Sequence, residues 1–126
     1  SFISSRSFSE SPHKVSSMGV AFAQGLEESL VFPVAKHFPG HGGISLDTHL
    51  TTPYRQVSYQ TLLNSDLIPF SQYANSEING GIMVAHISYP LVDATRLPAT
   101  FSKYLVTHIL TEEMKYKGLI MTDDIE

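Results

Sequence analysis

Three short apolar runs, at 31–37, 82–87 and 119–124, alternate along the chain with segments whose apolar positions recur every three or four residues. The runs are continuous, which is typical of strands in a parallel sheet with both faces covered. The three-to-four spacing predicts helices at 12–30, 59–64, 67–76 and 103–116. This alternation predicts an α/β fold in which helical crossovers join parallel strands.

Local signals predict where the helices begin and end. Ser11 followed by Pro12 is a typical start for the first helix. Ser58, Asp66 and Ser102 precede the other three at the capping position, and Gly118 is placed to end the last one. One stripe of the first helix is predicted to pack into the core, and it consists of Val15, Met18, Phe22, Leu26 and Leu30.

Polar residues stand at the carboxyl end of each apolar run. Lys36 and His37 end the first run, His86 the second, and Asp123 and Asp124 the third. The carboxyl ends of parallel strands open on one side, where active sites are built in (β/α)8 barrels and in open doubly wound sheets. We therefore expect these side chains to meet, while the pattern leaves both architectures open.

The segment 36–49 reads KHFPGHGGISLDTH and combines a cation, three imidazoles, a carboxylate and three glycines. Glycines and Pro39 predict that a Gly-rich loop follows the first strand. Asp47 and His49 are two apart, so in extended backbone they point to one face. The carboxylate could hold one ring nitrogen and leave the other for proton transfer. From the residues alone, a catalytic loop, a metal site and a plain surface loop remain open.

This loop resembles a motif of family 3 glycoside hydrolases, in the β-N-acetylhexosaminidase branch, which reads K-H-F-P-G-H-G, a short spacer, then D-[ST]-H. Three other segments resemble conserved stretches of that branch: Ile3–Phe8, Met83–Pro90 and Pro98–Ser102. The resemblance implies that residues 1–126 are about three β/α units of a (β/α)8 TIM-type barrel, the N-terminal catalytic domain. The chain has 126 residues, about half of the ~250 residues that such a barrel contains.

The resemblance also implies a function. The family's branch contains retaining exo-glycosidases that hydrolyse terminal β-linked N-acetylglucosamine, in bacteria typically from muropeptides during cell-wall recycling. It implies that Asp123 is the nucleophile, with Asp124 as the second choice on chemistry alone. It implies that His49, oriented by Asp47, is the acid and base.

Binding roles follow from the same resemblance. Arg6, Lys36 and His37 match residues that contact the sugar, and His86 is assigned a supporting role. A carbohydrate is then the expected partner, and no cofactor is implied.

Composition limits the other classes of function. With 8 Lys and Arg against 12 Asp and Glu, the net charge of −4 argues against a nucleic-acid or anionic-membrane partner. No run reaches the ~18 apolar residues of a membrane span. The absence of cysteine excludes disulfides and thiolate metal sites. The first residues contain no apolar leader, so no signal peptide is expected and a cytoplasmic location is favoured.

Two alternatives stay open. The first is a metal-dependent hydrolase, with the ligands His37, His41, Asp47, His49 and Asp123. The second is an inactive fragment, because the strands that precede this segment in the family, with a substrate-binding Asp, are absent from the sequence.

Overall fold

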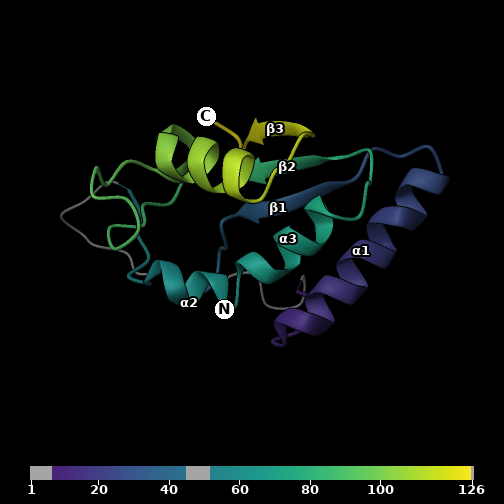
Figure 1. Cartoon of the computed structure of the whole chain (residues 1–126), viewed down its shortest axis with the longest axis horizontal. Helices are drawn as coiled ribbons and strands as arrows, with labels where there is room; N and C mark the ends of the chain where they lie inside the picture. The colour runs from purple at the N-terminus through teal and green to yellow at the C-terminus, as the bar shows by residue number, and fades with distance from the viewer. Residues whose placement is uncertain (1–6, 45–51, 126) are drawn as a thin grey trace.

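The computed structural model describes residues 7–44 and 52–125. Its elements follow in the order α1 (Pro12–Glu28), β1 (Val34–Phe38), α2 (Tyr59–Leu63), α3 (Leu67–Ala74), β2 (Gly81–Val84), η2 (Ala99–Phe101), η3 (Tyr104–Glu113) and β3 (Leu119–Thr122). The strands form one parallel sheet in the order β1-β2-β3 (Figure 1). The predicted α/β alternation is therefore confirmed for three parallel strands.

The strands are shorter than the apolar runs predict, and the two outer strands, β1 and β3, are less buried. β1 begins at Val34, after Pro33, because proline has no N–H to contribute to the ladder. Val31 and Phe32, predicted to belong to this buried strand, are 50% and 48% exposed. In the described part of the chain β1 pairs with β2 alone, so an edge position leaves one side of it uncovered.

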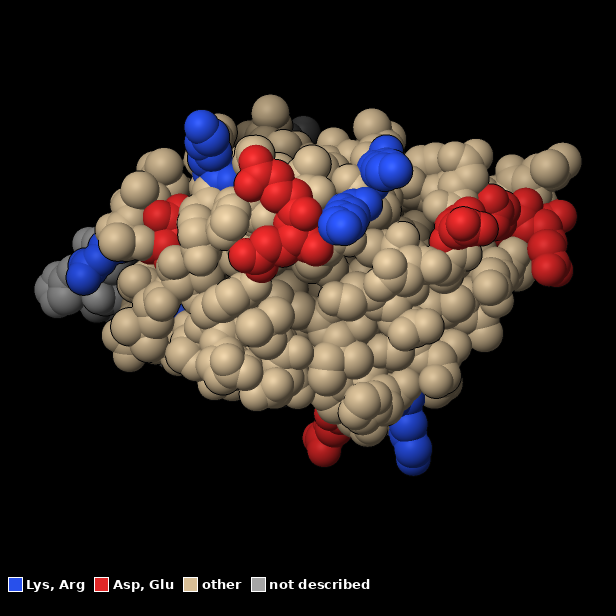
Figure 2. Space-filling model, in the orientation of Figure 1, with Lys and Arg blue, Asp and Glu red and all other residues tan. Residues whose placement is uncertain are grey.

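The core lies around the central strand and the helices next to it. Ile82 and Val84 of β2 are buried, together with Leu67 and Phe70 of α3 and Ile109 of η3. α3 and η3 lie next to each other, since residues of both line a cavity of about 340 Å³. On the face of the molecule that Figure 2 shows, charged side chains lie along the upper part, and a broad area below them, over α3, carries none.

The predicted core stripe of α1 is wrong for Met18, Phe22 and Leu30, while Val15 and Leu26 are half-buried. Met18 is 47% exposed and Phe22 is 59% exposed, while Leu30 lies beyond the end of the helix and is 97% exposed. The buried residues of α1 are Ser16 and Ala23. α1 packs against α3, so the buried face of α1 centres on these two small residues and not on the predicted stripe.

The helix ends agree with local signals in part. The Ser102 hydroxyl accepts a hydrogen bond from the Leu105 amide (3.0 Å), so the predicted cap is confirmed. The helix that follows is a π-helix and ends at Glu113, not at 116. Gly118 therefore does not end it; a Cβ there would lie 2.2 Å from the hydroxyl oxygen of Tyr116, so Gly118 gives that phenol room. In the described ranges, no helix has the length and apolar character needed to cross a bilayer.

Candidate active site

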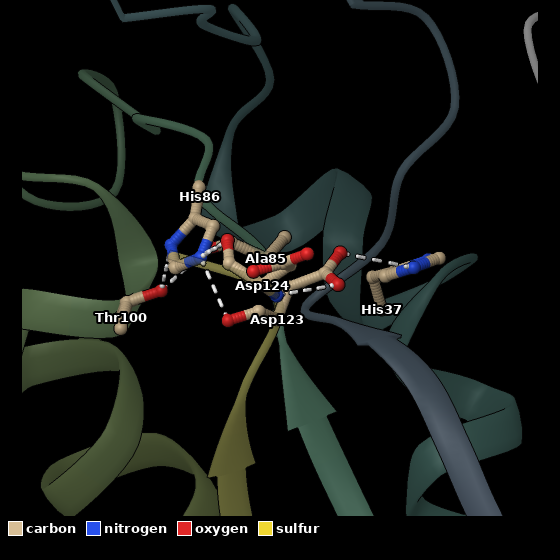
Figure 3. Close-up of polar contacts among 6 residues, drawn as sticks. All are labelled: His37, Ala85, His86, Thr100, Asp123 and Asp124. Atoms are coloured by element: carbon tan, nitrogen blue, oxygen red, sulfur yellow. Dashed lines mark hydrogen bonds and ion pairs between the residues drawn. The ribbon is translucent and has the colours of Figure 1, made fainter. Parts of the chain in front are cut away.

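The carboxyl ends of the three strands bring His37, His86 and Asp123 together (Figure 3). Parallel pairing places Val84 beside Thr122 and beside Phe38, so the residues at the strand ends become neighbours. His37 Nε2 lies 3.3 Å from Asp123 Oδ2. The side chains are 14% and 37% exposed, so this ion pair is open to solvent on the Asp123 side.

The Asp123 carboxylate is held as an anion. The Asp124 amide donates a hydrogen bond to Asp123 Oδ1 (2.9 Å) and lowers the pKa of this carboxyl. Burial opposes that shift, and the nearby His37, Lys36 and His86 lower the pKa further. An ionised carboxylate with one accessible side can act as a nucleophile or can stabilise a developing positive charge.

His86 contacts the backbone beside Asp123 and not its carboxylate. Its Nε2 lies 3.1 Å from the Asp123 carbonyl oxygen and 2.8 Å from that of Asp124. Its Nδ1 lies 2.7 Å from Thr100 Oγ1. His86 therefore connects the end of β2 with the turn that follows β3.

The loop after β1 is held in place by contacts at Gly40. Gly40 has φ +143°, and the buried phenol of Tyr89 donates a hydrogen bond to its carbonyl oxygen. Asp66 lies against Gly40 and forms a bidentate ion pair with Arg55, with N–O distances of 2.7 and 3.1 Å. Ser65 also donates to Asp66 (2.7 Å).

The prediction that Asp66 stands at the N-cap of α3 is confirmed in position, but not in its side-chain contact. Asp66 makes no side-chain hydrogen bond to the helix start, because its carboxylate is used by Arg55 and Ser65. Sequence reasoning missed the Arg55–Asp66 pair because the two residues are 11 apart and lie on opposite sides of α2, so no single helical or strand repeat relates them. No local signal in the sequence points to it.

Three candidate residues, Arg6, Asp47 and His49, lie outside the described residues. Of the others, Lys36 is exposed beside His37. The His37 and His41 rings lie 4.9 Å apart between centroids. Within residues 7–44 and 52–125, no group of three or more His, Cys, Asp or Glu is arranged to hold a metal ion.

Comparisons with known proteins match the whole chain. Residues 1–126 match the N-terminal domain of glycosyl hydrolase family 3. A β-hexosaminidase from Methylococcus capsulatus is 39% identical over 123 residues, which cover 98% of this chain and 36% of that protein. The chain spans between 22% and 36% of the length of curated bacterial β-hexosaminidases that it matches.

Solved structures agree with this match. Zinc-bound CbsA from Thermotoga neapolitana is 40% identical with a TM-score of 0.90, and the match covers 98% of this chain and 27% of that one. NagZ from Neisseria gonorrhoeae, in complex with N-trifluoroacetyl-D-glucosamine, is 36% identical with a TM-score of 0.86, and the match covers 98% and 35%. Three parallel strands alternating with helices therefore correspond to part of the fold of these proteins.

Proposed function

The chain belongs to glycosyl hydrolase family 3, and from that premise we propose that the protein containing it is a retaining exo-glycosidase. It releases terminal β-linked N-acetylglucosamine from a cell-wall muropeptide or a related glycoside, and its strands form part of a (β/α)8 barrel. The observation that carries the proposal is the ionised Asp123 carboxylate at the end of β3, 3.3 Å from His37 Nε2. The gonococcal relative in complex with an N-acylated glucosamine supports the choice of sugar.

Asp123 is the nucleophile in this proposal. Its carboxylate attacks the anomeric carbon, the glycosidic bond breaks, and a covalent glycosyl ester forms that water then hydrolyses. The hydrogen bond from the Asp124 amide keeps the carboxyl ionised and occupies Oδ1. The proposal gives Arg6, Lys36 and His37 to the sugar hydroxyls, and His37 adjoins the nucleophile.

The acid and base in the proposal is His49, oriented by Asp47. Support comes from the D-T-H sequence at 47–49 and its spacing from the K-H-F-P-G-H-G motif. An imidazole has a pKa near neutrality, so it can protonate the leaving oxygen and then remove a proton from the attacking water. It also avoids a second anion beside Asp123.

Metal-dependent hydrolysis is the second candidate, because two relatives are zinc-bound, CbsA from Thermotoga neapolitana and NagZ from Neisseria gonorrhoeae. Among the described residues, His37, His41 and Asp123 are not part of any group of three or more side chains arranged to hold a metal ion. Dialysis of the full-length protein against EDTA separates the two: the glycosidase keeps its activity, and a metal-dependent hydrolase loses it until zinc is restored.

Covalent labelling tests the nucleophile. A full-length protein that carries this segment is treated with the 5-fluoro glycosyl fluoride of N-acetylglucosamine, and peptide mapping should find the label on Asp123. Asp124→Asn serves as the matched control and should still be labelled. A label on Asp124, or inverted product stereochemistry without an adduct, would refute the assignment.

The role of His49 as acid is tested in the same full-length protein with substrates that differ in how much their leaving group needs protonation. His49→Ala should lose hydrolysis of natural glycosides but keep most hydrolysis of dinitrophenyl glycosides, whose leaving group needs no protonation. Equal losses on both substrates contradict the role of His49.

A further inference from the structure

The ion pair between Arg55 and Asp66 lies at the base of the Gly-rich loop that follows β1. Its two guanidinium nitrogens lie 2.7 and 3.1 Å from the two carboxylate oxygens, and the side chains are only 16% and 17% exposed. Bidentate pairing of arginine with a carboxylate fixes the orientation of both groups as well as their distance. The pair can therefore hold two segments of the chain in a fixed relation.

Both partners of the pair lie against glycines of this loop. A Cβ built on Gly40 would lie 2.4 Å from Asp66 Oδ1, so the carboxylate is directly beside the Gly40 backbone. A Cβ on Gly43 would lie 3.7 Å from Arg55 Nε, which is van der Waals contact. The buried phenol of Tyr89 donates a hydrogen bond to the Gly40 carbonyl oxygen. The stretch that leaves β1 is thus in contact with the ion pair at two points.

The backbone of Arg55 is attached to the segment that follows β2. Its amide donates to the Ser88 carbonyl oxygen (2.9 Å), and the Ser88 amide donates to the Pro53 carbonyl oxygen (3.0 Å). Tyr54 forms an isolated parallel bridge with Ser88 between these two hydrogen bonds. Arg55 therefore belongs to the stretch that follows the loop, whereas the glycines that the ion pair faces belong to the stretch that precedes it.

The stretch that precedes the loop also leads to the candidate site. His41 follows Gly40 in the sequence, and its ring lies 4.9 Å from the His37 ring between centroids. His37 Nε2 in turn lies 3.3 Å from Asp123 Oδ2. A change in the path of the chain at Gly40 therefore changes what lies beside the His37–Asp123 pair.

We propose that Arg55 and Asp66 are positioning residues for His49. Their ion pair holds together the two ends of segment 44–54, whose sequence contains Asp47 and His49. Fixing the ends of a segment limits the positions that the residues between them sample, and a catalytic group is effective only where it is oriented toward the reacting atoms. The inference rests on the proposed function, which assigns the acid and base role to His49.

The test uses the full-length protein and a double-mutant cycle. Asp66→Asn keeps the shape that fits against Gly40 and removes the charge. Arg55→Met removes the guanidinium group and keeps an unbranched side chain, while Arg55→Lys keeps the charge without the bidentate geometry. Glu112→Gln is the matched control, because it removes an exposed ion pair on η3, with His108 at 3.2 Å.

The first measurement is kcat/KM on two N-acetylglucosaminides, one with a sugar as leaving group and one with dinitrophenol, which needs no protonation. Arg55→Met and Asp66→Asn should lower the first value by about 10- to 100-fold and the second by less than about threefold. Arg55→Lys should recover part of the loss. The double variant should be no worse than the poorer single variant, because the pair acts as a unit. Glu112→Gln should equal wild type on both substrates.

The second measurement is hydrogen exchange at the amides of Arg55 and Val57, which donate to the carbonyl oxygens of Ser88 and Arg55 (2.9 and 3.2 Å). Exchange at these amides should be about tenfold faster in Asp66→Asn than in wild type, because the stretch that follows the loop loses its ion pair. It should be unchanged in Glu112→Gln. This measurement does not depend on activity.

Two results overturn the positioning role. One is an equal loss on both substrates, since a smaller amount of folded protein lowers both rates alike. The other is exchange in Asp66→Asn that equals exchange in wild type. Should Arg55→Met not fold, Asp66→Asn and Arg55→Lys are judged by the same comparison of substrates.

His49→Ala, measured in parallel, separates this inference from the proposed function. If His49→Ala loses both substrates equally, or if wild type hydrolyses neither, the proposed function fails, and hydrogen exchange still decides whether the ion pair holds the chain at Arg55. If His49→Ala spares the dinitrophenyl glycoside but Arg55→Met and Asp66→Asn do not, the positioning role alone fails.

Discussion

Gly40 shows how a single residue shapes the loop beside the site. Its φ of +143° belongs to a region that side chains rarely adopt. A Cβ at this position would lie 2.4 Å from Asp66 Oδ1. Asp66 cannot move away freely, because Arg55 holds both of its oxygens. Glycine is therefore required both by the backbone and by its neighbour.

Replacement of Gly40 by alanine should distort this loop. Backbone strain of about 1–3 kcal/mol and the clash with Asp66 should lower the thermal unfolding midpoint of the full-length protein and its kcat/KM. Gly42→Ala is the matched control, because a Cβ on Gly42 meets nothing within 4 Å. If both variants unfold at the same temperature, Gly40 is not needed for the loop.

At the level of elements, η3 starts from a buried polar network. The Ser102 hydroxyl accepts from the Leu105 amide and donates to the Asp93 carboxylate, which also accepts from the amide and the hydroxyl of Thr95. Burial by itself raises the pKa of Asp93, but the hydrogen bonds from Ser102 and Thr95 lower it more, and the net shift is downward. The folded carboxyl therefore releases its proton at lower pH than the unfolded one.

The free energy of unfolding should therefore decrease in acid, and Ser102 should set the pH at which the decrease occurs. The ionised Asp93 carboxylate contributes fully to the free energy of unfolding above a pH of about 4, which is the pKa of this carboxyl in the unfolded chain. The contribution is lost as the pH falls through the lower pKa that the carboxyl has in the folded protein. Ser102→Ala should cost about 1–2 kcal/mol at neutral pH. It should also shift the loss on the acid side to higher pH, because the pKa of Asp93 rises.

The measurement is the unfolding midpoint between neutral pH and pH of about 3. Ser58→Ala is the control, since Ser58 caps α2 through the Thr61 amide (3.1 Å) and contacts no carboxylate in the described structure. An unchanged acid profile in Ser102→Ala would show that Ser102 does not stabilise ionised Asp93.

At the scale of the whole molecule, the sheet is open on both sides. In the described part of the chain, β1 and β3 each pair only with β2, so each has one unpaired edge. A groove of about 580 Å³ between α1, β1 and α3 is lined in part by Phe8, Phe22 and Leu26. Open edges and exposed apolar side chains favour association with other protein surfaces.

Residues 1–126 expressed alone should therefore self-associate, retain helical circular dichroism and show no glycosidase activity. The orientation of substrate by surrounding elements supplies ~7–11 kcal/mol of an enzyme's advantage, and three strands provide only part of such a pocket. Light scattering and an assay with 4-methylumbelliferyl N-acetylglucosaminide test this expectation. Turnover within about tenfold of a full-length homologue, from a monomer, would show that the pocket is complete without further elements.

Local patterns in the sequence determined the order of strands and helices, the parallel sheet and the meeting of His37, His86 and Asp123. Periodicity and the caps at Ser58 and Ser102 depend only on near neighbours in the chain. The meeting of the three side chains follows because the carboxyl ends of parallel strands lie at the same edge of a sheet.

Only the tertiary structure decided which face of α1 is buried, and it revealed the Arg55–Asp66 pair and the contact between Thr100 and His86. The partners in these contacts come from segments that no local repeat in the sequence relates. A short stretch of sequence therefore does not reveal which residues will be in contact. The apolar stripe of α1 was misjudged for the same reason: hydrophobicity is a property of the residue, whereas burial depends on which surface the fold places against it.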